Sequence, residues 1–214
     1  MDIRGESAVM LSALPIELLS PATLHDRSAV MRSPSAAPAR PGLYAWYFSE
    51  IPKGVDAGGC YVSNGHTLLY VGISPSAPPA NGKAPSRSHI KQRLRTHYGG
   101  NAAGSTLRLT LGCLLSDELG IQLRRVGSGG RFTFSNPGEQ RIDAWMHDHA
   151  KVVWIEDERP WEREARILAS GLRLPLNIAG NSHASVAALS ALRREMREAA
   201  SLLPILPDSG GARR

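Results

Sequence analysis

The chain has 214 residues, of which 42% are apolar, 21% charged and 6% aromatic, enough to bury a sizeable core within one domain. Its formal charge of +6 suits an anionic partner. Only Cys60 and Cys113 are present, so the sequence supports neither a disulfide framework nor a cysteine zinc site, and a reducing compartment fits. The first residues lack the order of a secretory signal, and no apolar run reaches the roughly 18 residues of a membrane span. We therefore expect a soluble, cytoplasmic protein without a membrane partner.

The N-terminal part of the chain, residues 1–40, is expected to be a partly disordered arm. Its segment 28–41 is rich in Ser, Pro, Ala and Arg and is not expected to pack well. The compact domain is predicted to begin near Pro41. Two apolar runs of strand length follow, at 42–48 and 67–73. The Gly- and Pro-containing stretch between them is typical of an elongated hairpin.

A proline-rich loop then leads to a predicted helix at 88–98, with Ser88 as its N-cap and Gly99 and Gly100 at its end. Its apolar stripe recurs at helical spacing. The members of this stripe are Ile90, Leu94, His97 and Tyr98.

The second half of the chain is predicted to contain more helices and a third strand. Apolar spacing indicates helices at 107–119, 160–169 and 185–203, and a strand at 149–156. A proline at position 160 suits the first turn of a helix. The last helix is predicted to place its arginines outward, namely Arg193, Arg194 and Arg197.

Charge is distributed unevenly along this map. Residues 83–131 carry nine Lys and Arg against two acids, which is typical of a surface that faces phosphates. Residues 132–169 carry eight acids against five bases. An acidic group beside a basic groove is what metal-assisted phosphodiester cleavage needs. The residues predicted to contact a nucleic-acid backbone, without reading its sequence, are Lys91, Arg95, Arg108, Arg124 and Arg125.

Two charged residues fall on or beside apolar helix faces. On a helical wheel for 160–169, Glu164 lies inside an apolar arc, whereas Glu162 lies on the solvent side. The arc consists of Trp161, Ala165, Leu168 and Leu172, with Ile167 at its far margin. A carboxylate placed there needs a metal or a cation as partner. Arg93 flanks the stripe of the helix at 88–98, so the two residues either belong to a site or pair as a structural salt bridge, and both interpretations stay open.

Read in chain order, these pieces resemble the GIY-YIG nuclease superfamily. Its first motif is matched by Gly42-Leu43-Tyr44 and its second by Tyr70-Val71-Gly72, with Leu and Val in place of the two isoleucines. The family's arginine, following histidine, metal-binding glutamate and terminal asparagine are matched by Arg93, His97, Glu164 and Asn177. The resemblance covers residues 41–178, with an insertion at about 99–149 expected to affect substrate choice more than chemistry. A C-terminal helix and tail, 179–214, lie outside it.

The resemblance implies a small α/β domain of the α+β type, with a central three-stranded, mainly antiparallel sheet flanked by helices, a helical insertion and a C-terminal helix. It implies an endonuclease acting on nucleic acid, with DNA as the expected substrate. Glu164 would bind one divalent ion, Mg²⁺ or Mn²⁺. Tyr44, aided by His97 or Tyr70, would take a proton from water, Arg93 would hold the phosphate, and Asn177 would order the site.

Two other functions are compatible with the sequence. One is a noncatalytic nucleic-acid-binding module in which Glu164 and Arg93 form a structural pair. The other is a metal-binding protein centred on His147, His149 and nearby acids, although this spacing makes them weak ligand candidates.

Overall fold

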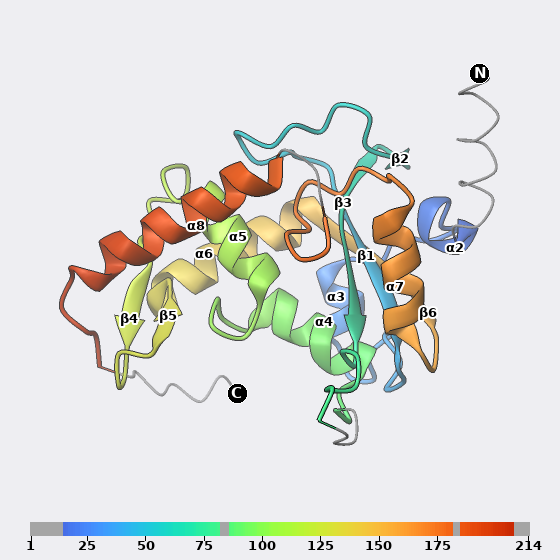
Figure 1. The fold of residues 1–214 in the computed structure, drawn as a ribbon, viewed down its shortest axis with the longest axis horizontal. Coiled ribbons are helices and arrows are strands. Elements are labelled where there is room, and N and C mark those ends of the chain that lie inside the picture. The colour runs from blue at the N-terminus through green and yellow to red at the C-terminus, as the bar shows by residue number, and fades with distance from the viewer. Residues whose placement is uncertain (1–14, 82–85, 182–184, 208–214) are drawn as a thin grey trace.

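A four-stranded antiparallel sheet is the centre of the computed structural model, which describes residues 15–81, 86–181 and 185–207 (Figure 1). The strand order is β2-β3-β1-β6. The strands are β1 (Gly42–Phe48), β2 (Val62–Ser63), β3 (His66–Ser74) and β6 (Ala150–Glu156). Three of them were predicted, and β2 adds a two-residue strand inside the expected hairpin. The predicted fold class is confirmed.

Strand β1 lies between β3 and β6, and all seven of its residues are buried. Its side chains alternate between the two faces of the sheet. Tyr44, Trp46 and Phe48 belong to the larger apolar core, and Leu43, Ala45 and Tyr47 belong to the smaller one. A strand buried on both faces reads as one continuous apolar run, which explains why this strand was predicted with its observed bounds.

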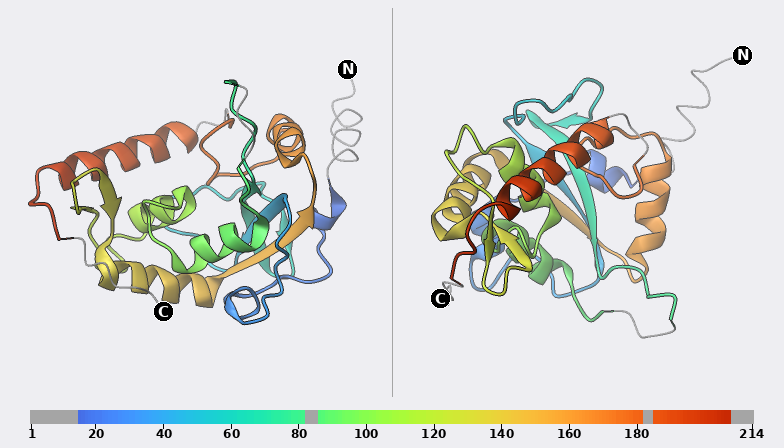
Figure 2. Two further views of the ribbon diagram at one scale, coloured as in Figure 1. Left: turned by 90° about the horizontal axis from the view of Figure 1, so that it is seen from below. Right: turned by 60° about the vertical axis from the view of Figure 1, so that its left-hand side comes forward.

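Helices cover both faces of the sheet at β1 and β3, so that this part of the molecule has three layers: helix, sheet and helix (Figure 2, right). Helix α7 (Pro160–Ala169) contacts β3 and β1 on the face of the smaller core, where Ile167 is buried. The other face is covered by α4 (Ile90–Gly99), whose Ile90, Leu94 and Tyr98 are fully buried.

The region between α4 and β6 builds a second half of the molecule beside the sheet (Figure 1). Its elements are α5 (Thr106–Leu114), β4 (Arg124–Val126), β5 (Arg131–Thr133) and α6 (Ser135–His149). Helix α5 was predicted to extend to 119 but ends at Leu114, and residues 115–120 turn toward Gly120, which has a φ of 56°. Helix α6 was not predicted, since Pro137 and Gly138 lie in its first turn and obscure the helical spacing further along.

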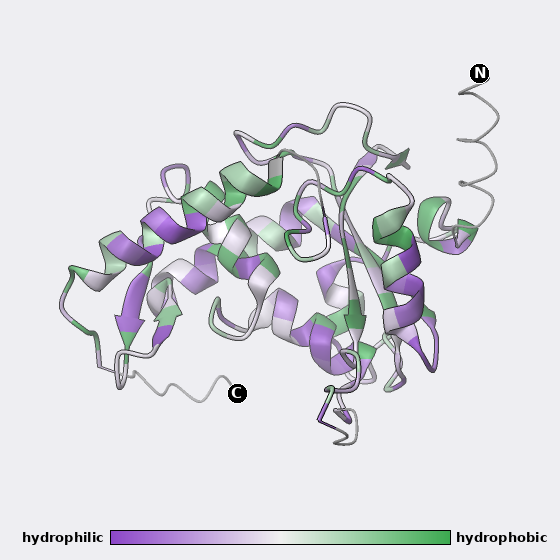
Figure 3. Ribbon diagram, in the orientation of Figure 1, coloured by the Kyte–Doolittle hydropathy of each residue, from purple (hydrophilic) through white to green (hydrophobic). Residues whose placement is uncertain are grey.

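Helix α8 (Ser185–Ser201) lies along this second half and contacts α5 and β4. Its first turns are apolar, whereas hydrophilic residues dominate its second half and the neighbouring β4 (Figure 3). None of the helices in the described ranges is long and apolar enough to span a membrane.

The described part of the N-terminal arm packs on the domain through α2 (Ile16–Leu19) and α3 (Arg27–Met31). Val30 and Ala37 are buried, so the expectation that segment 28–41 does not pack was wrong. The side chain of Arg95 explains the difference, because its guanidinium donates hydrogen bonds to the last carbonyls around α3. The predictions for the start of the N-terminal arm, residues 1–14, and for the C-terminal tail at 208–214 concern residues outside the described ranges.

Candidate functional site

The two tyrosine motifs are neighbours on paired strands. In the register of β1 with β3, Tyr44 pairs with Gly72 and Trp46 with Tyr70. The ring of Tyr44 lies directly over the backbone of Gly72, where an added Cβ would come within 2.6 Å of the Tyr44 hydroxyl oxygen. The glycine of the second motif is therefore required by the position of the tyrosine of the first.

The hydroxyl of Tyr44 is held by a hydrogen-bonded chain that runs into α4 and α5. Its oxygen lies 3.0 Å from Nε2 of His97, and Nδ1 of His97 lies 2.7 Å from Oγ of Ser105. Ser105 is the N-cap of α5 and accepts the backbone N–H of Arg108. We assign the His97 tautomer from this network: Nδ1–H donates to Ser105, and Nε2 accepts the Tyr44 proton. Sequence reasoning missed Ser105, whose only signal was a serine just before a predicted helix.

Burial sets the protonation of both groups. Tyr44 is 1% exposed and His97 is fully buried. Burial lowers the pKa of His97 well below its ordinary value, and the charges of Arg93 and Arg108 act in the same direction, so the imidazole is neutral at pH 7. Burial and the neighbouring Tyr70 raise the pKa of Tyr44, against an opposing effect of Arg93. The pair thus consists of a protonated phenol and a neutral base.

Four of the predicted site residues line one cavity of ≈ 590 Å³. They come from four elements: Tyr44 from β1, Tyr70 from β3, Arg93 from α4 and Glu164 from α7. The Arg93 guanidinium also donates a 2.9 Å hydrogen bond to the carbonyl of Gly104, which fixes its position. The cavity therefore joins a carboxylate, a guanidinium and a buried Tyr–His pair.

Glu164 lies half-buried in the wall of this cavity. Burial raises the pKa of its carboxyl to about 7, and no nearby charge offsets this effect. Glu164 and Arg93 form no ion pair, and the Glu164 carboxylate makes no hydrogen bond or ion pair with another residue of the described ranges. A half-buried carboxylate of this kind calls for a cation from outside the chain.

The donor set suits a single hard divalent cation. Magnesium is usually held through one or two carboxylates together with water and phosphate oxygens rather than by a complete protein cage. Among the described residues that line the cavity, Glu164 is the one acidic residue, and none of them binds either of its carboxylate oxygens. The residues present therefore fit one Mg²⁺ or Mn²⁺ ion, whereas a two-metal site would need a further carboxylate.

Only part of the apolar arc predicted on α7 faces the core. Ile167, placed at its margin by the helical wheel, is 2% exposed and enters the smaller core. Trp161, Ala165 and Leu168 line the cavity, and Leu168 also packs against the smaller core. The wheel could not distinguish these faces, because the wall of an open cavity and a core are both apolar.

The side chain of Asn177 is hydrogen-bonded to the backbone of β3. Its side-chain amide donates to the carbonyl of Val71 at 2.8 Å and accepts the N–H of Val71 at 2.9 Å. The backbone N–H of Leu176 also donates to the carbonyl of Leu69. Segment 174–178 therefore satisfies the edge of β3 next to Tyr70, a positioning contribution rather than direct chemistry.

Arg108 was predicted on a nucleic-acid-binding surface, and this prediction is wrong. The side chain is fully buried and forms ion pairs of 2.6 Å with Glu139 and 2.7 Å with Asp143, both from α6. It also donates to the carbonyl of His97. The insertion at 99–149 therefore supports the position of His97, a contribution that its sequence did not reveal.

Three other predicted contact residues use their guanidinium groups within the protein. Arg125 donates to the last carbonyl of α8, Arg124 donates to the carbonyl of Pro204 just beyond this helix, and Arg95 donates to carbonyls around α3. Guanidinium groups in such positions stabilise the C-terminal ends of helices. Lys91 is half-buried on α4. A nucleic-acid contact by these four residues stays a prediction.

The two histidines at the end of α6 do not form a metal centre with other residues. His149 pairs with Glu50 at 3.4 Å, and its ring lies 5.1 Å from that of Trp145 at a tilt of 45°. His147 is exposed. Across residues 15–81, 86–181 and 185–207, no three His, Cys, Asp or Glu side chains lie together so that they could hold a metal ion.

Comparison with known families agrees with this geometry. A family model described as the GIY-YIG catalytic domain matches residues 42–198, well over half of the chain. The chain belongs to the GIY-YIG family. This is a nuclease family whose members generally use a divalent metal, and the match includes most of α8. No curated protein and no solved structure matches the chain.

Proposed function

We propose that this GIY-YIG protein is a metal-dependent endonuclease that hydrolyses phosphodiester bonds in DNA, with water as the nucleophile. The observation that carries the proposal is the single cavity in which Glu164, which has no ion-pair partner among the described residues, lies with Arg93 and the Tyr44–His97 pair. These groups supply a metal ligand, a phosphate ligand and a route for a proton.

Glu164 would hold one Mg²⁺ or Mn²⁺ ion through its carboxylate. When bound, such an ion polarises the phosphate and neutralises charge on the leaving oxygen. Arg93 binds a non-bridging phosphate oxygen, a task for which its hydrogen bond to Gly104 keeps the guanidinium in place.

Tyr44 and His97 move the proton of the attacking water. The Tyr44 oxygen takes a proton from water as its own proton passes to Nε2 of His97, 3.0 Å away. The water oxygen forms the new bond to phosphorus, the bond to the leaving oxygen breaks, and that oxygen is protonated from solvent. Because the phenol exchanges one proton for another, it never has to exist as a free phenolate, which burial disfavours. The anionic phosphate offsets the positive charge that His97 acquires beside Arg93 and Arg108.

Tyr70 is a less suitable proton acceptor for Tyr44. Burial raises its pKa, and its own side chain is engaged with Thr106. The geometry therefore favours the Tyr44–His97 pair and gives Tyr70 a role in shaping the cavity wall.

A nicking assay on supercoiled plasmid tests the proposal, using wild type, Glu164→Gln and Glu162→Gln in Mg²⁺ and in chelator. Glu162 is the matched control because it lies on the same helix but is exposed and ion-paired with Arg159. We expect cleavage in Mg²⁺ only, loss of at least 100-fold in Glu164→Gln, and retention in Glu162→Gln. If folded wild type cleaves neither plasmid, single strands nor RNA while it still binds nucleic acid, the chain is a noncatalytic module and the proposal is wrong.

A further inference from the structure

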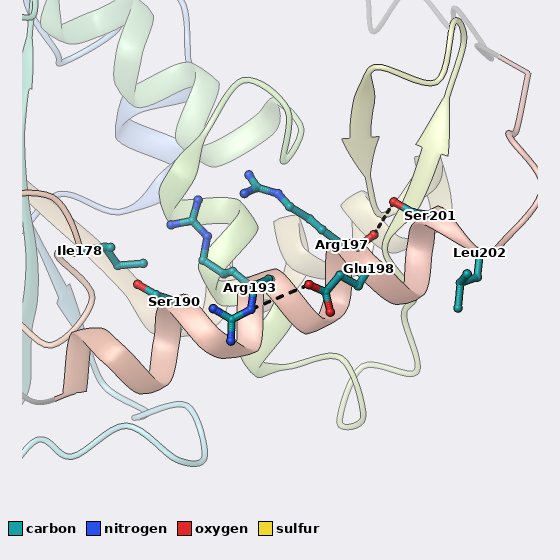
Figure 4. A pocket seen from close by; sticks show the side chains of 8 residues that line it. Ile178, Ser190, Arg193, Arg197, Glu198, Ser201 and Leu202 are labelled. Carbon is teal, nitrogen blue, oxygen red and sulfur yellow. Dashed lines mark hydrogen bonds and ion pairs between the residues drawn. The ribbon is translucent and has the colours of Figure 1, made fainter.

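A second cavity continues from the candidate site toward α8. This cavity of ≈ 320 Å³ shares Tyr70 and Glu164 with the candidate site and is also lined by Arg193 of α8. Arg193 and Ile178 also line a third cavity of ≈ 670 Å³ that follows α8 (Figure 4). Shared lining residues connect the three cavities into one groove that leads from Glu164 along the C-terminal helix.

Arg193 is an unusual cation in this groove. The side chain is half-buried, and its buried Nε has no hydrogen-bond partner among the described residues. Burial lowers the pKa of the guanidinium, and the neighbouring Arg197 contributes in the same direction. A half-buried cation without a carboxylate is costly unless an anion arrives from elsewhere.

Arg197 lies one turn further along α8, where it is exposed and adds a second cation to the lining of the third cavity. Its guanidinium points the same way as that of Arg193 (Figure 4), and its central carbon lies 6.0 Å from the centre of the Phe132 ring. Like charges one turn apart on a helix repel each other. The nearby acid, Glu198, is paired with Arg194 at 3.9 Å and therefore does not neutralise the Arg193–Arg197 pair.

We infer that Arg193 and Arg197 form a phosphate-binding subsite, which takes a backbone phosphate of the DNA strand next to the one that is cleaved. The inference rests on the proposed function, because it places the scissile phosphate between Arg93 and Glu164. It extends that function by making α8 the element that guides the substrate strand. Guanidinium groups bind phosphate through paired hydrogen bonds, and a groove that continues from the reacting centre is where the next phosphate of the strand lies.

The subsite acts on the backbone rather than on bases. We therefore expect it to strengthen binding of every sequence about equally and to contribute to the salt dependence of binding. Arg125 donates to the carbonyl of Ser201 at the end of α8, and Arg124 donates to that of Pro204 just beyond it, so these two arginines fix the position of the end of this helix.

Fluorescence anisotropy in chelator measures this binding without cleavage. The full-length protein is titrated against a labelled 16-nucleotide strand and its duplex, as wild type, Arg193→Met, Arg197→Met and Arg194→Met. Arg194 is the matched control, because it lies on the same helix but is exposed and paired with Glu198. We expect affinity to fall about tenfold in Arg193→Met and in Arg197→Met, and less than twofold in Arg194→Met. The slope of log K against log salt should decrease by about 0.9 per lost contact on duplex and about 0.7 on the single strand.

Unchanged affinity and salt slope in both Arg193→Met and Arg197→Met would overturn the inference, as would an equal loss in Arg194→Met. Thermal melts accompany the titrations, and two separate variants keep the test decisive if one of them fails to fold. The outcome is separable from that of the proposed function. Weaker binding by the variants with no cleavage by wild type would refute the endonuclease alone, whereas cleavage by wild type with normal binding by the variants would refute the subsite alone.

Discussion

Glu164→Gln removes a charge at the candidate metal ligand while keeping the shape of the side chain, and we expect it to make the metal-free protein more stable. Burial raises the pKa of the Glu164 carboxyl to about 7 from an ordinary value of 4.5. The folded protein therefore holds this proton more tightly than the unfolded chain does. The stability associated with the neutral carboxyl is fully present below pH 4.5 and is lost as the pH rises through about 7. Above pH 7 the wild type carries a half-buried anion that the glutamine variant lacks.

The size of the effect follows from the difference between the two pKa values. A difference between about 7 and 4.5 would be equivalent to about 3 kcal/mol if it were expressed in full. Glu164 borders an open cavity, where solvent screens its charge, so we expect about 1–2 kcal/mol at pH 8. For a chain of this length, that corresponds to a melting temperature about 3–6 °C higher in Glu164→Gln than in wild type.

Thermal melts in chelator between pH 5 and pH 8.5 measure this difference, which should be small at pH 5 and largest at pH 8. Glu162→Gln provides the control, because the exposed Glu162 carboxylate should give no such pH-dependent gain. Mg²⁺ should narrow the gap by stabilising wild type alone, by about 1.4 kcal/mol at ten times its dissociation constant. A melting temperature of Glu164→Gln below that of wild type at pH 8 would refute the reasoning, since it would mean that the carboxylate is a structural ion-pair partner.

Three further substitutions test the scaffold of the site. Gly72→Ala places a Cβ 2.6 Å from the Tyr44 hydroxyl oxygen, so we expect a loss of about 1–3 kcal/mol in thermal unfolding and a nicking rate at least 100-fold lower. Asn177→Ala leaves the buried backbone N–H and C=O of Val71 without the Asn177 side chain, which should lower the free energy of unfolding in urea by about 2–4 kcal/mol. A loss below 0.5 kcal/mol would contradict a stabilising role of these two hydrogen bonds. Arg108→Ala leaves an unpaired buried carboxylate, and chemical denaturation should show a loss of about 3–5 kcal/mol, with a near-neutral result contradicting the buried ion pair.

Much of the fold could be predicted because several elements carry strong local signals. Strand β1 is a continuous apolar run, and α7 has a proline at its first position and Gly171 two residues after its end. Helix α6 and strand β2 could not be predicted in this way. The first turn of α6 contains Pro137 and Gly138, and β2 is a two-residue strand, too short to show a period.

The candidate site was predictable where its residues are attached to regular elements in a fixed order. Tyr44 and Tyr70 were placed correctly on strands, and Arg93 and Glu164 on helices, before any of them could be placed in one cavity. The prediction was wrong where a side chain depends on a partner distant in sequence. Arg108 is buried because Glu139, 31 residues later, lies opposite it, and no local pattern contains that information.

The charged residues of this protein that are buried or half-buried fall into two groups, those that form ion pairs within the chain and those that do not. Arg108 and Glu139 neutralise each other inside the chain, and their removal should affect folding first. Glu164 and Arg193 line one cavity, and no ion pair within the described residues neutralises either of them. Their missing partners have opposite signs, because the carboxylate needs a cation and the guanidinium needs an anion. Under the proposed function, a DNA strand with its metal ion would supply both at once, so metal should tighten the binding of DNA to wild type more than to Glu164→Gln.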